Sequence, residues 1–419
     1  MGQLHKRLTT ESVVAVLKKY EEKEIDVKAA CAQLGVKRRR FFELLKDWRE
    51  NPDEFDIGYE RESPNRVSAK AEAAIEEELL KEKTIIEDPE LPTRYYNYSY
   101  VQNILEDHHN VTVSLDTIIR RAKNLDCYKE KKKKKGVHDR EVLTNYVGEL
   151  VQHDSSVHFW SPYAEKKWYL ITSIDDYSRY MLYAALVSKE TSWRHISALE
   201  SVVLRFGFPK AYYADQHSIF RYVKGRDDRI ANQRSETDAF DPQWKQVILD
   251  CGIEPIYALS PQAKGKVERP YHWMQDRVVR TASREQLVDL NDVQQVVQQE
   301  VDRYNNRQVH STTKEIPRVR FERAVEQGQS LFRDFVLPPQ YESTKDLFAL
   351  RYKRRVDVYR KISLFGTKLF VPKAPPRHEV DIRLYPDIEK QLVEVRFHCQ
   401  SEFVGAQALK FADIPTVHF

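Results

Sequence analysis

Three carboxylates in this sequence are placed where they could hold divalent metal ions. Asp154 and Asp215 end apolar segments that are typical of strands, and Glu268 lies near the start of a segment that is typical of a helix. Carboxylate oxygens are ligands that Mg²⁺ prefers, and two such ions can activate an attacking oxygen and stabilise a leaving one. Three acids that converge from two strands and a helix therefore predict metal-dependent phosphoryl transfer.

The residues around Glu268 are basic, in the stretch SPQAKGKVERPYHWMQDR. The basic neighbours are Lys264, Lys266 and Arg269. A helix N-terminus that carries lysines attracts phosphate groups, and phosphate contacts supply much of the affinity for DNA. His272 lies one turn after Glu268, where it either contacts a terminal phosphate or packs against the protein. The substrate expected from these residues is a phosphodiester.

Other interpretations of the acidic residues remain open. Any one of the three carboxylates, taken alone, is more simply a solvated surface residue. Asp175 and Asp176 also follow a predicted strand, in SIDDYSR, and compete as metal ligands. We interpret them as turn residues beside the site.

Composition limits the class of protein. The chain has 419 residues, too many for one ordinary domain, and a net charge of only +4. Its four cysteines are far apart, which argues against a zinc ribbon or a disulfide framework. An apolar signal region and an apolar run of membrane-spanning length are both absent from the sequence. We expect a soluble protein of a reducing compartment, with no membrane partner.

Two helical units are predicted in the first third of the chain, at residues 1–52 and 66–127. Each contains two short helices around a tight turn, which is typical of a helix-turn-helix. Such units bind DNA or other proteins, and basic residues favour DNA. Those residues lead the last helix of the first unit or lie on the last helix of the second: Arg38, Arg39, Arg40, Arg120 and Arg121. A basic linker is expected at 128–145.

The rest of the chain predicts an α/β core followed by a β-rich tail. Residues 146–283 contain three neighbouring strands, then helix, strand, helix, strand and helix, the order of a ribonuclease-H-like core. A helical connector is expected at 286–330 and a small β-barrel at 348–419. The predicted fold class is multidomain α+β.

Several stretches of this sequence resemble one family. They are GELVQHDSSVHFW, SIDDYSRYM, AYYADQHSIFR, SPQAKGKVERPYHWMQDRVV, DRYNNRQVH and VTVSLDTIIRRAKNL. Together they are similar to bacterial insertion-sequence DDE transposases, which have a catalytic core of the retroviral-integrase type. One departure is a long spacing between the second and third acids, which we interpret as an insertion at 221–243. Acids inside that insertion compete as the second ligand, but the stretch YYADQHSIF favours Asp215.

The resemblance implies a function and its parts. Asp154, Asp215 and Glu268 would be the catalytic metal ligands, holding two Mg²⁺ ions, with Mn²⁺ as a substitute. The partners would be double-stranded DNA, as the terminal inverted repeats of a mobile element and as target DNA, and further copies of the chain, at least a dimer on DNA. The enzyme would free 3′ hydroxyls at the element ends and join them to target DNA in the bacterial cytoplasm, at the nucleoid. A phage-type DDE recombinase and a non-catalytic DNA-binding regulator are the alternatives.

Overall fold

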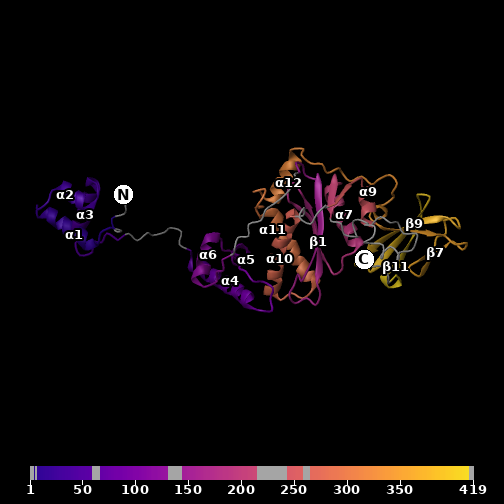
Figure 1. Ribbon diagram of the computed structural model, residues 1–419, viewed down its shortest axis with the longest axis horizontal. Helices are drawn as coiled ribbons and strands as arrows, with labels where there is room; N and C mark the ends of the chain where they lie inside the picture. Colours follow the sequence, from indigo (N-terminus) through magenta and orange to yellow (C-terminus); the bar gives the residue numbers. More distant parts are fainter. Residues whose placement is uncertain are drawn as a thin grey trace. The chain divides into compact units, whose positions relative to one another are not determined.

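The computed structural model describes residues 4, 7–58, 67–130, 144–214, 243–257 and 265–414, with the backbone alone at 265–269. The chain divides into two compact units, Met1–Glu72 and Ala73–Phe419 (Figure 1). Among the described residues, every helix is too short or too polar to cross a lipid bilayer.

The first unit contains the three helices that the sequence predicts. They are α1 (Thr10–Glu21), α2 (Val27–Leu34) and α3 (Arg38–Glu50). Asp26 caps α2 by accepting a hydrogen bond from the backbone N–H of Ala29, and Gly35 ends it with φ +60°, a conformation that glycine adopts without strain. Apolar residues at helical spacing, including Leu17, Leu34 and Phe41, form the small core. Its DNA-binding role stays a prediction.

The second unit begins with a further set of helices. They are α4 (Ala69–Glu87, whose first turn belongs to the first unit), α5 (Tyr98–His109) and α6 (Leu115–Asn124). Asn97 caps α5, and Ser114 caps α6 as its sequence position suggests. Between them Asn110 takes a left-handed conformation that turns the chain. The pair α5 and α6 therefore has the tight connection that the sequence predicts for the second helical unit.

A five-stranded sheet follows, and its element order is the predicted one. The elements are β1 (Leu150–His158), β2 (Trp168–Asp175), β3 (Met181–Val187), α7 (Ser192–Phe206), β4 (Ala211–Ala214), α9 (Gln243–Asp250), β5 (Glu254–Tyr257) and α10 (Gly265–Glu285). The strands lie in the order β3-β2-β1-β4-β5. The first three are antiparallel, whereas β4 runs parallel to β1 and β5 parallel to β4. The carboxyl ends of β1 and β4 therefore point the same way.

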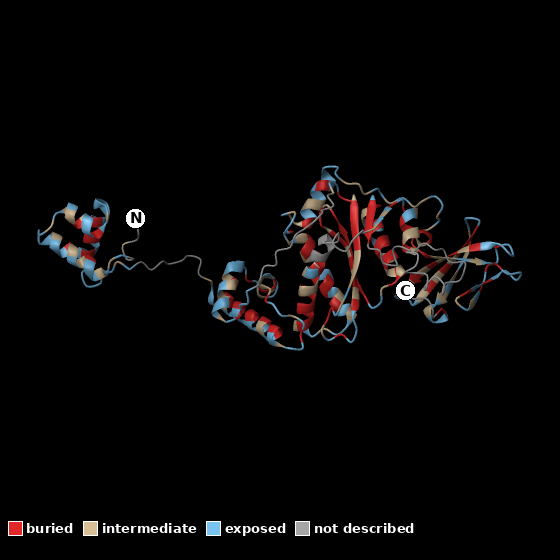
Figure 2. Cartoon of the chain, in the orientation of Figure 1, coloured by how far each residue is buried: buried red, intermediate tan, exposed pale blue. Residues whose placement is uncertain are grey.

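Helices cover both faces of this sheet (Figures 1 and 2). On one face, α10 and α11 (Leu290–Asn306) pack on an apolar cluster that includes Leu170, Met274 and Val297. The side chain of Asn305 on α11 also exchanges hydrogen bonds with the backbone of Met181 on β3, at 2.9 and 3.0 Å. So α11, expected in a connector, forms part of the layer that covers the core sheet.

The C-terminal strands form a sheet and a hairpin. After α12 (Pro317–Glu326) and α13 (Thr344–Leu347) come β6 (Leu350–Arg355), β7 (Lys361–Leu364), β8 (Thr367–Phe370), β9 (Glu379–Asp387), β10 (Leu392–Cys399) and β11 (Glu402–Lys410). The described strands pair as a four-stranded sheet, β11-β10-β9-β6, and a separate β7–β8 hairpin, so the small β-barrel expected from the sequence is not confirmed. Ile362, Leu364 and Leu369 of the hairpin lie in the same apolar cluster as the sheet, and this cluster also includes residues of α7 and α9. Trp193 and Tyr385, for example, meet there with ring centroids 5.1 Å apart.

Candidate catalytic centre

Asp154 lies on β1, in the middle of the strand and not at its end. The strand continues to His158 because it pairs with β2 over its whole length, and Thr172 is the residue opposite Asp154. Pairing with β4 covers only Leu150 to Gln152, so Asp154 lies past the part of β1 that β4 flanks in the described structure. Its side chain is half-buried. Asp154 therefore sits where β1 leaves the parallel part of the sheet.

The other two predicted ligands fall outside the described side chains. Asp215 comes directly after Ala214, the last described residue of β4, and Lys264 also lies outside the described residues. The backbone of α10 includes Glu268, Lys266 and Arg269, but their side chains are outside the description. Among the described residues, His, Cys, Asp and Glu form no group of three that could hold a metal ion. The set of three carboxylates therefore stays a prediction.

Two hydrogen bonds attach α10 to the strand pair that carries Asp154. The hydroxyl of Thr172 donates to the hydroxyl of Tyr271 at 2.8 Å, and the amide of Gln275 donates to the hydroxyl of Ser156 at 3.3 Å. Ser156 is two residues from Asp154 and lies on the same face of β1. Tyr271 and Gln275 follow Glu268 by three and seven residues, spacings that return to one face of a helix. The face of α10 that carries Tyr271 and Gln275 is thus the face that meets β1 and β2.

His272 is exposed to solvent. Of the two roles expected for it, packing against the protein is therefore not supported, and the contact with phosphate stays a prediction.

Asp175, the last residue of β2, and Asp176, the first residue of the turn that follows, are both buried. The carboxylate of Asp175 accepts hydrogen bonds from the backbone N–H of Gly148 and from both the N–H and the hydroxyl of Ser178. Burial raises the pKa of Asp175 to about 6, against these hydrogen bonds. Asp176 forms an ion pair with Arg179 at 2.9 Å. These contacts fasten the turn, as expected for residues beside the site.

A polar chain that the sequence analysis missed lies on the opposite face of β1. His153, the residue before Asp154, contacts the hydroxyl of Ser173 at 2.9 Å and the ring of His195 at 2.8 Å. His195 in turn contacts Glu190 at 2.9 Å, and Glu190 also accepts a hydrogen bond from Ser155. The alternation of side chains along a strand predicts that His153 and Asp154 face opposite ways, but no spacing reveals the partner His195. This chain fixes β1 from behind Asp154.

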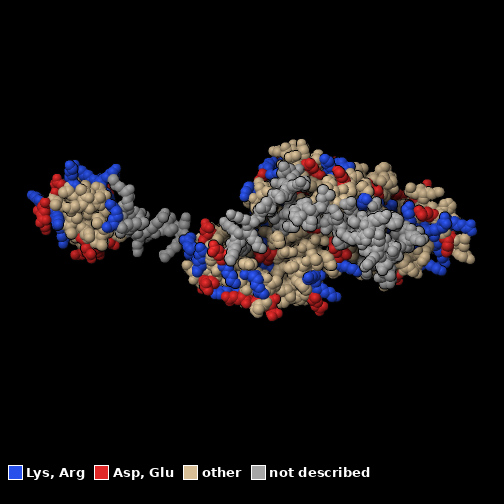
Figure 3. Space-filling view, in the orientation of Figure 1, with Lys and Arg blue, Asp and Glu red and all other residues tan. Residues whose placement is uncertain are grey.

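The arginines expected to contact DNA are on the surface. Arg38, Arg39 and Arg40 are exposed at the start of α3, and Arg39 and Arg40 share an ion pair with Glu43. On α6, Arg120 is exposed and Arg121 is half-buried. Figure 3 shows further basic side chains gathered over the β7–β8 end of the C-terminal sheet, where the exposed residues are Arg360, Lys361 and Lys368. Each surface is available to a polyanion, and DNA contact remains a prediction for all of them.

Comparison with known proteins identifies transposases as relatives. The transposase-like protein y4bF of Sinorhizobium fredii is 27% identical over 201 residues, which are 48% of this chain and 42% of that protein. The transposase for insertion sequence IS1202 of Streptococcus pneumoniae is 29% identical over 144 residues, 34% of this chain and 29% of that protein. The chain thus matches less than half of the length of either curated relative. No family model matches the chain.

Solved structures of two viral integrases are also similar. The catalytic core domain of HTLV-2 integrase, in complex with magnesium, matches 40% of this chain and 92% of its own, with 16% identity and a TM-score of 0.29. The intasome of simian T-cell lymphotropic virus, in complex with PP2A regulatory subunit B56 gamma, matches 73% of this chain and 95% of its own, with 12% identity and a TM-score of 0.35. Because both TM-scores lie below 0.5, neither match establishes a shared overall fold. The sequence matches are what confirm the resemblance read from the motifs: this chain is similar to bacterial transposases, among them the transposase of an insertion sequence.

Proposed function

We propose that this chain is a DNA transposase that cleaves the ends of a mobile element and joins the freed 3′ hydroxyls to target DNA. The observation that carries the proposal is the hydrogen bond between Thr172 and Tyr271. It ties the residue opposite Asp154 to a residue one helical turn from Glu268. This contact supports a common location for two of the three predicted carboxylates.

The pairing register of β1 and β4 supports Asp215 as the third carboxylate of the set. Leu150, Val151 and Gln152 on β1 pair with three consecutive residues of β4, and β4 ends at Ala214. Carried two residues further, the same register would bring position 215 opposite Asp154. Parallel neighbouring strands present such residues side by side at one edge of a sheet. We therefore propose Asp154, Asp215 and Glu268 as the catalytic set.

The donor set fits Mg²⁺, with Mn²⁺ as a substitute. Carboxylates are the oxygen ligands expected of such a site, and Asp154 is half-buried on a strand fixed on both faces. Asp154, Asp215 and Glu268 would hold two ions. Bound there, the ions supply activation of the attacking oxygen and stabilisation of the leaving oxygen.

The chain itself contributes position and charge. The Thr172–Tyr271 and Gln275–Ser156 hydrogen bonds orient α10 on the strands, so that the acids from separate elements keep fixed spacings. The basic residues at the start of α10, Lys264, Lys266 and Arg269, would hold the DNA backbone at the site. Because an element has two ends that are cut and joined together, we propose at least a dimer on DNA.

End recognition is assigned to the two helical units. Their exposed basic residues are Arg38, Arg39, Arg40 and Arg120, with Arg121 half-buried beside them. Contacts from such residues to phosphates give affinity, and contacts to base edges give sequence specificity. The terminal repeats of the element and the target DNA are the proposed DNA partners.

The test is incubation of the full chain with DNA that contains one element end and its flank, with and without Mg²⁺. We expect nicks at the 3′ end of the element and joined products only when Mg²⁺ or Mn²⁺ is present. Specific binding of the end without nicking or joining under any metal condition would support a non-catalytic regulator and contradict the proposal.

A further inference from the structure

A network of buried hydrogen bonds lies on the face of β1 opposite to the side chain of Asp154. His153 on β1 and His195 on α7 are both buried, and their facing ring nitrogens, Nε2 and Nδ1, lie 2.8 Å apart. The Nδ1 of His153 lies 2.9 Å from the hydroxyl of Ser173 on β2. The Nε2 of His195 lies 2.9 Å from Oε1 of Glu190, which precedes α7. We call Ser173, His153, His195 and Glu190 the histidine network, and it links β1 and β2 to the start of α7.

Glu190 sets the direction of the hydrogen bonds in the histidine network. Its carboxylate accepts, so the Nε2–H of His195 donates to it, and the Nδ1 of that neutral ring is an acceptor. The Nε2–H of His153 then donates to His195, and the Nδ1 of His153 accepts from the hydroxyl of Ser173. These tautomers are assigned from the pattern of partners. Removal of the acceptor at position 190 would therefore disturb every link of the network.

Both neighbours of Asp154 in the strand are tied to one oxygen atom of Glu190. The hydroxyl of Ser155 donates directly to Oε1, the atom that also accepts from His195. His153 reaches the same atom through the ring of His195. Side chains alternate along a strand, so His153 and Ser155 share one face of β1 while Asp154 points to the other. The backbone is thus held on each side of the proposed metal ligand.

The ring of His153 is also enclosed by aromatic side chains. The ring of Trp244 on α9 lies nearly parallel to it, with centroids 5.9 Å apart, and the ring of Tyr212 on β4 lies at 5.8 Å. Close packing of this kind restricts the rotation of a buried ring. The position of His153 is therefore set by contacts with β2, β4, α7 and α9 together.

Hydrogen bonds fix the position of a strand more tightly than apolar packing does, because they depend on direction as well as distance. Mg²⁺ demands near-ideal octahedral geometry, so the placement of each carboxylate affects how well an ion is held. In a buried network, the loss of one partner leaves another polar group unsatisfied. The effect of a defect at Glu190 should thus reach the strand at Asp154.

We propose that Glu190 and His195 are positioning residues of the catalytic centre. They fix β1 on both sides of Asp154, and Glu190 does so as a hydrogen-bond acceptor and not through its charge. The inference rests on the proposed function, because it takes Asp154 as a metal ligand. It goes beyond that function by assigning a role in metal binding to residues on the face of β1 that points away from the metal.

The first test compares two substitutions of Glu190 in the full chain. Glu190→Gln keeps an acceptor oxygen and removes the charge, whereas Glu190→Leu removes the acceptor. We expect Glu190→Leu to raise the Mg²⁺ concentration for half-maximal strand transfer about five-fold, the equivalent of one lost hydrogen bond. Glu190→Gln should restore this concentration to within about two-fold of that of the unaltered chain. Equal Mg²⁺ requirements in the two variants would overturn the inference.

Two further variants separate positioning from general stability. Ser155→Ala removes only the direct link to Glu190, and we expect it to raise the required Mg²⁺ concentration about two-fold, the lower end of what one hydrogen bond contributes. If Glu190→Leu does not fold, an unchanged Mg²⁺ requirement in Ser155→Ala overturns the inference. Val203→Ala is the matched control, because Val203 packs in the apolar core of α7 and lies outside the histidine network. It should lower the unfolding temperature and leave the Mg²⁺ requirement unchanged. A rise equal to that in Glu190→Leu would show that the network acts only through stability, which would overturn the inference.

The second test does not depend on catalysis. A ligand that binds only the folded state raises its stability, so Mn²⁺ should raise the unfolding temperature of the unaltered chain but not of Asp154→Asn. At a fixed Mn²⁺ concentration the rise should be preserved in Glu190→Gln and smaller in Glu190→Leu. An undiminished rise in Glu190→Leu would contradict the inference. If the unaltered chain shows neither this rise nor metal-dependent strand transfer, the proposed function has failed, and that result is separate from any difference between the Glu190 variants.

Discussion

The hydroxyl of Tyr271 on α10 lies 2.8 Å from the hydroxyl of Thr172, the residue opposite Asp154 across β1 and β2. Both side chains are buried, so the contact is shielded from water. It is a direct link between the helix that includes Glu268 and the strand pair that includes Asp154. The link predicts that small changes at Tyr271 are felt as changes in metal binding, because the spacing of carboxylates decides how well they share an ion.

Tyr271→Phe is therefore expected to raise the Mg²⁺ concentration needed for half-maximal strand transfer. The net worth of one hydrogen bond is about 1 kcal/mol, so the rise should be roughly five-fold. A Mg²⁺ titration of strand transfer, at fixed DNA, measures it. Tyr304→Phe is the matched control, because the buried hydroxyl of Tyr304 has no hydrogen-bond partner among the described residues. An equal rise in the required Mg²⁺ concentration in both variants would show that the hydroxyl of Tyr271 has no special role in metal binding.

The three proposed metal ligands should be separable from DNA binding. Asp154→Asn, Asp215→Asn and Glu268→Gln are each expected to abolish nicking and joining, because each removes a charged oxygen ligand. Binding of an element end should change by less than about 0.5 kcal/mol, as for substitutions away from the contact surface. Product gels and a gel-shift titration check the two parts. Persistent strand transfer in any one of the three variants would refute its assignment as a ligand.

The arginines of the helical units should affect binding and not chemistry. Arg120→Ala is expected to weaken binding of the element end by roughly 1–3 kcal/mol if the guanidinium reads a base edge. A phosphate contact would instead lower the magnitude of the salt slope by about 0.9. Arg38→Ala and Arg39→Ala test the first unit in the same way. Arg318→Ala, which removes an exposed charge on α12, is the control, and equal weakening there would indicate a general charge effect.

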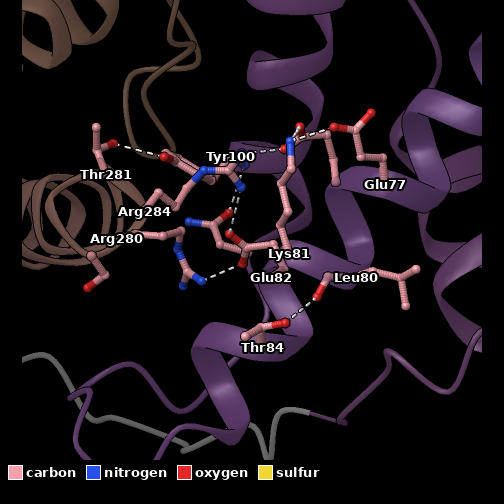
Figure 4. A network of polar contacts seen from close by, with 12 residues as sticks. Glu77, Leu80, Lys81, Glu82, Thr84, Tyr100, Arg280, Thr281 and Arg284 are labelled. Carbon is pink, nitrogen blue, oxygen red and sulfur yellow. Dashed lines mark hydrogen bonds and ion pairs between the residues drawn. The ribbon is translucent and has the colours of Figure 1, made fainter. Parts of the chain in front are cut away.

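Removing one member of the buried ion pair between Arg280 and Glu82 should destabilise the fold. Arg280→Met leaves Glu82 buried with only Arg284, 3.8 Å away, as its counter-charge (Figure 4), and we expect the free energy of unfolding to fall by up to roughly 3–5 kcal/mol. The double variant Arg280→Met with Glu82→Leu removes both charges and should recover most of that loss. Urea unfolding of the single and double variants measures the difference. A double variant that is as unstable as the single one would show that the pair itself, and not the stranded carboxylate, supplies the stability.

Glu200 should make stability depend on pH. Its carboxyl lies buried between α7 and β9, where it accepts a hydrogen bond from the hydroxyl of Tyr385 at 3.0 Å. Burial raises its pKa from 4.5 to about 7, although the hydrogen bond from Tyr385 opposes the shift. Between these two values the folded chain binds more protons than the unfolded chain, so stability falls as the pH rises through this window.

Glu200→Gln is accordingly expected to remove this pH dependence and to increase stability at pH 8 by roughly 1–3 kcal/mol. Thermal unfolding of both proteins between pH 5 and about pH 8 measures the change, over the range in which Glu200 titrates. An unchanged pH profile in the variant would show that Glu200 does not titrate in this window.

The sequence determined the local features of this protein. Apolar alternation predicted the strands from β1 to β5, and the capping residue Ser114 marked the start of a helix, because these signals act between near neighbours. Motifs around Asp154 and Glu268 predicted metal-dependent phosphoryl transfer before any fold was known. The end of β1 was misplaced because β2 pairs with it beyond Asp154, and pairing partners are not encoded in the strand itself.

The tertiary structure decided which distant elements meet. Arg280 and Glu82 are 198 positions apart, and nothing in their spacing predicts that each is the buried counter-charge of the other. Thr172 and Tyr271 are likewise an unremarkable threonine and tyrosine until folding brings their hydroxyls together. The alternation of the C-terminal strands predicted the strands themselves, but only folding brings their apolar side chains into one cluster with those of α7 and α9. Local patterns fix the elements, whereas burial and pairing between elements far apart in the chain are settled only when all of them compete for the same partners.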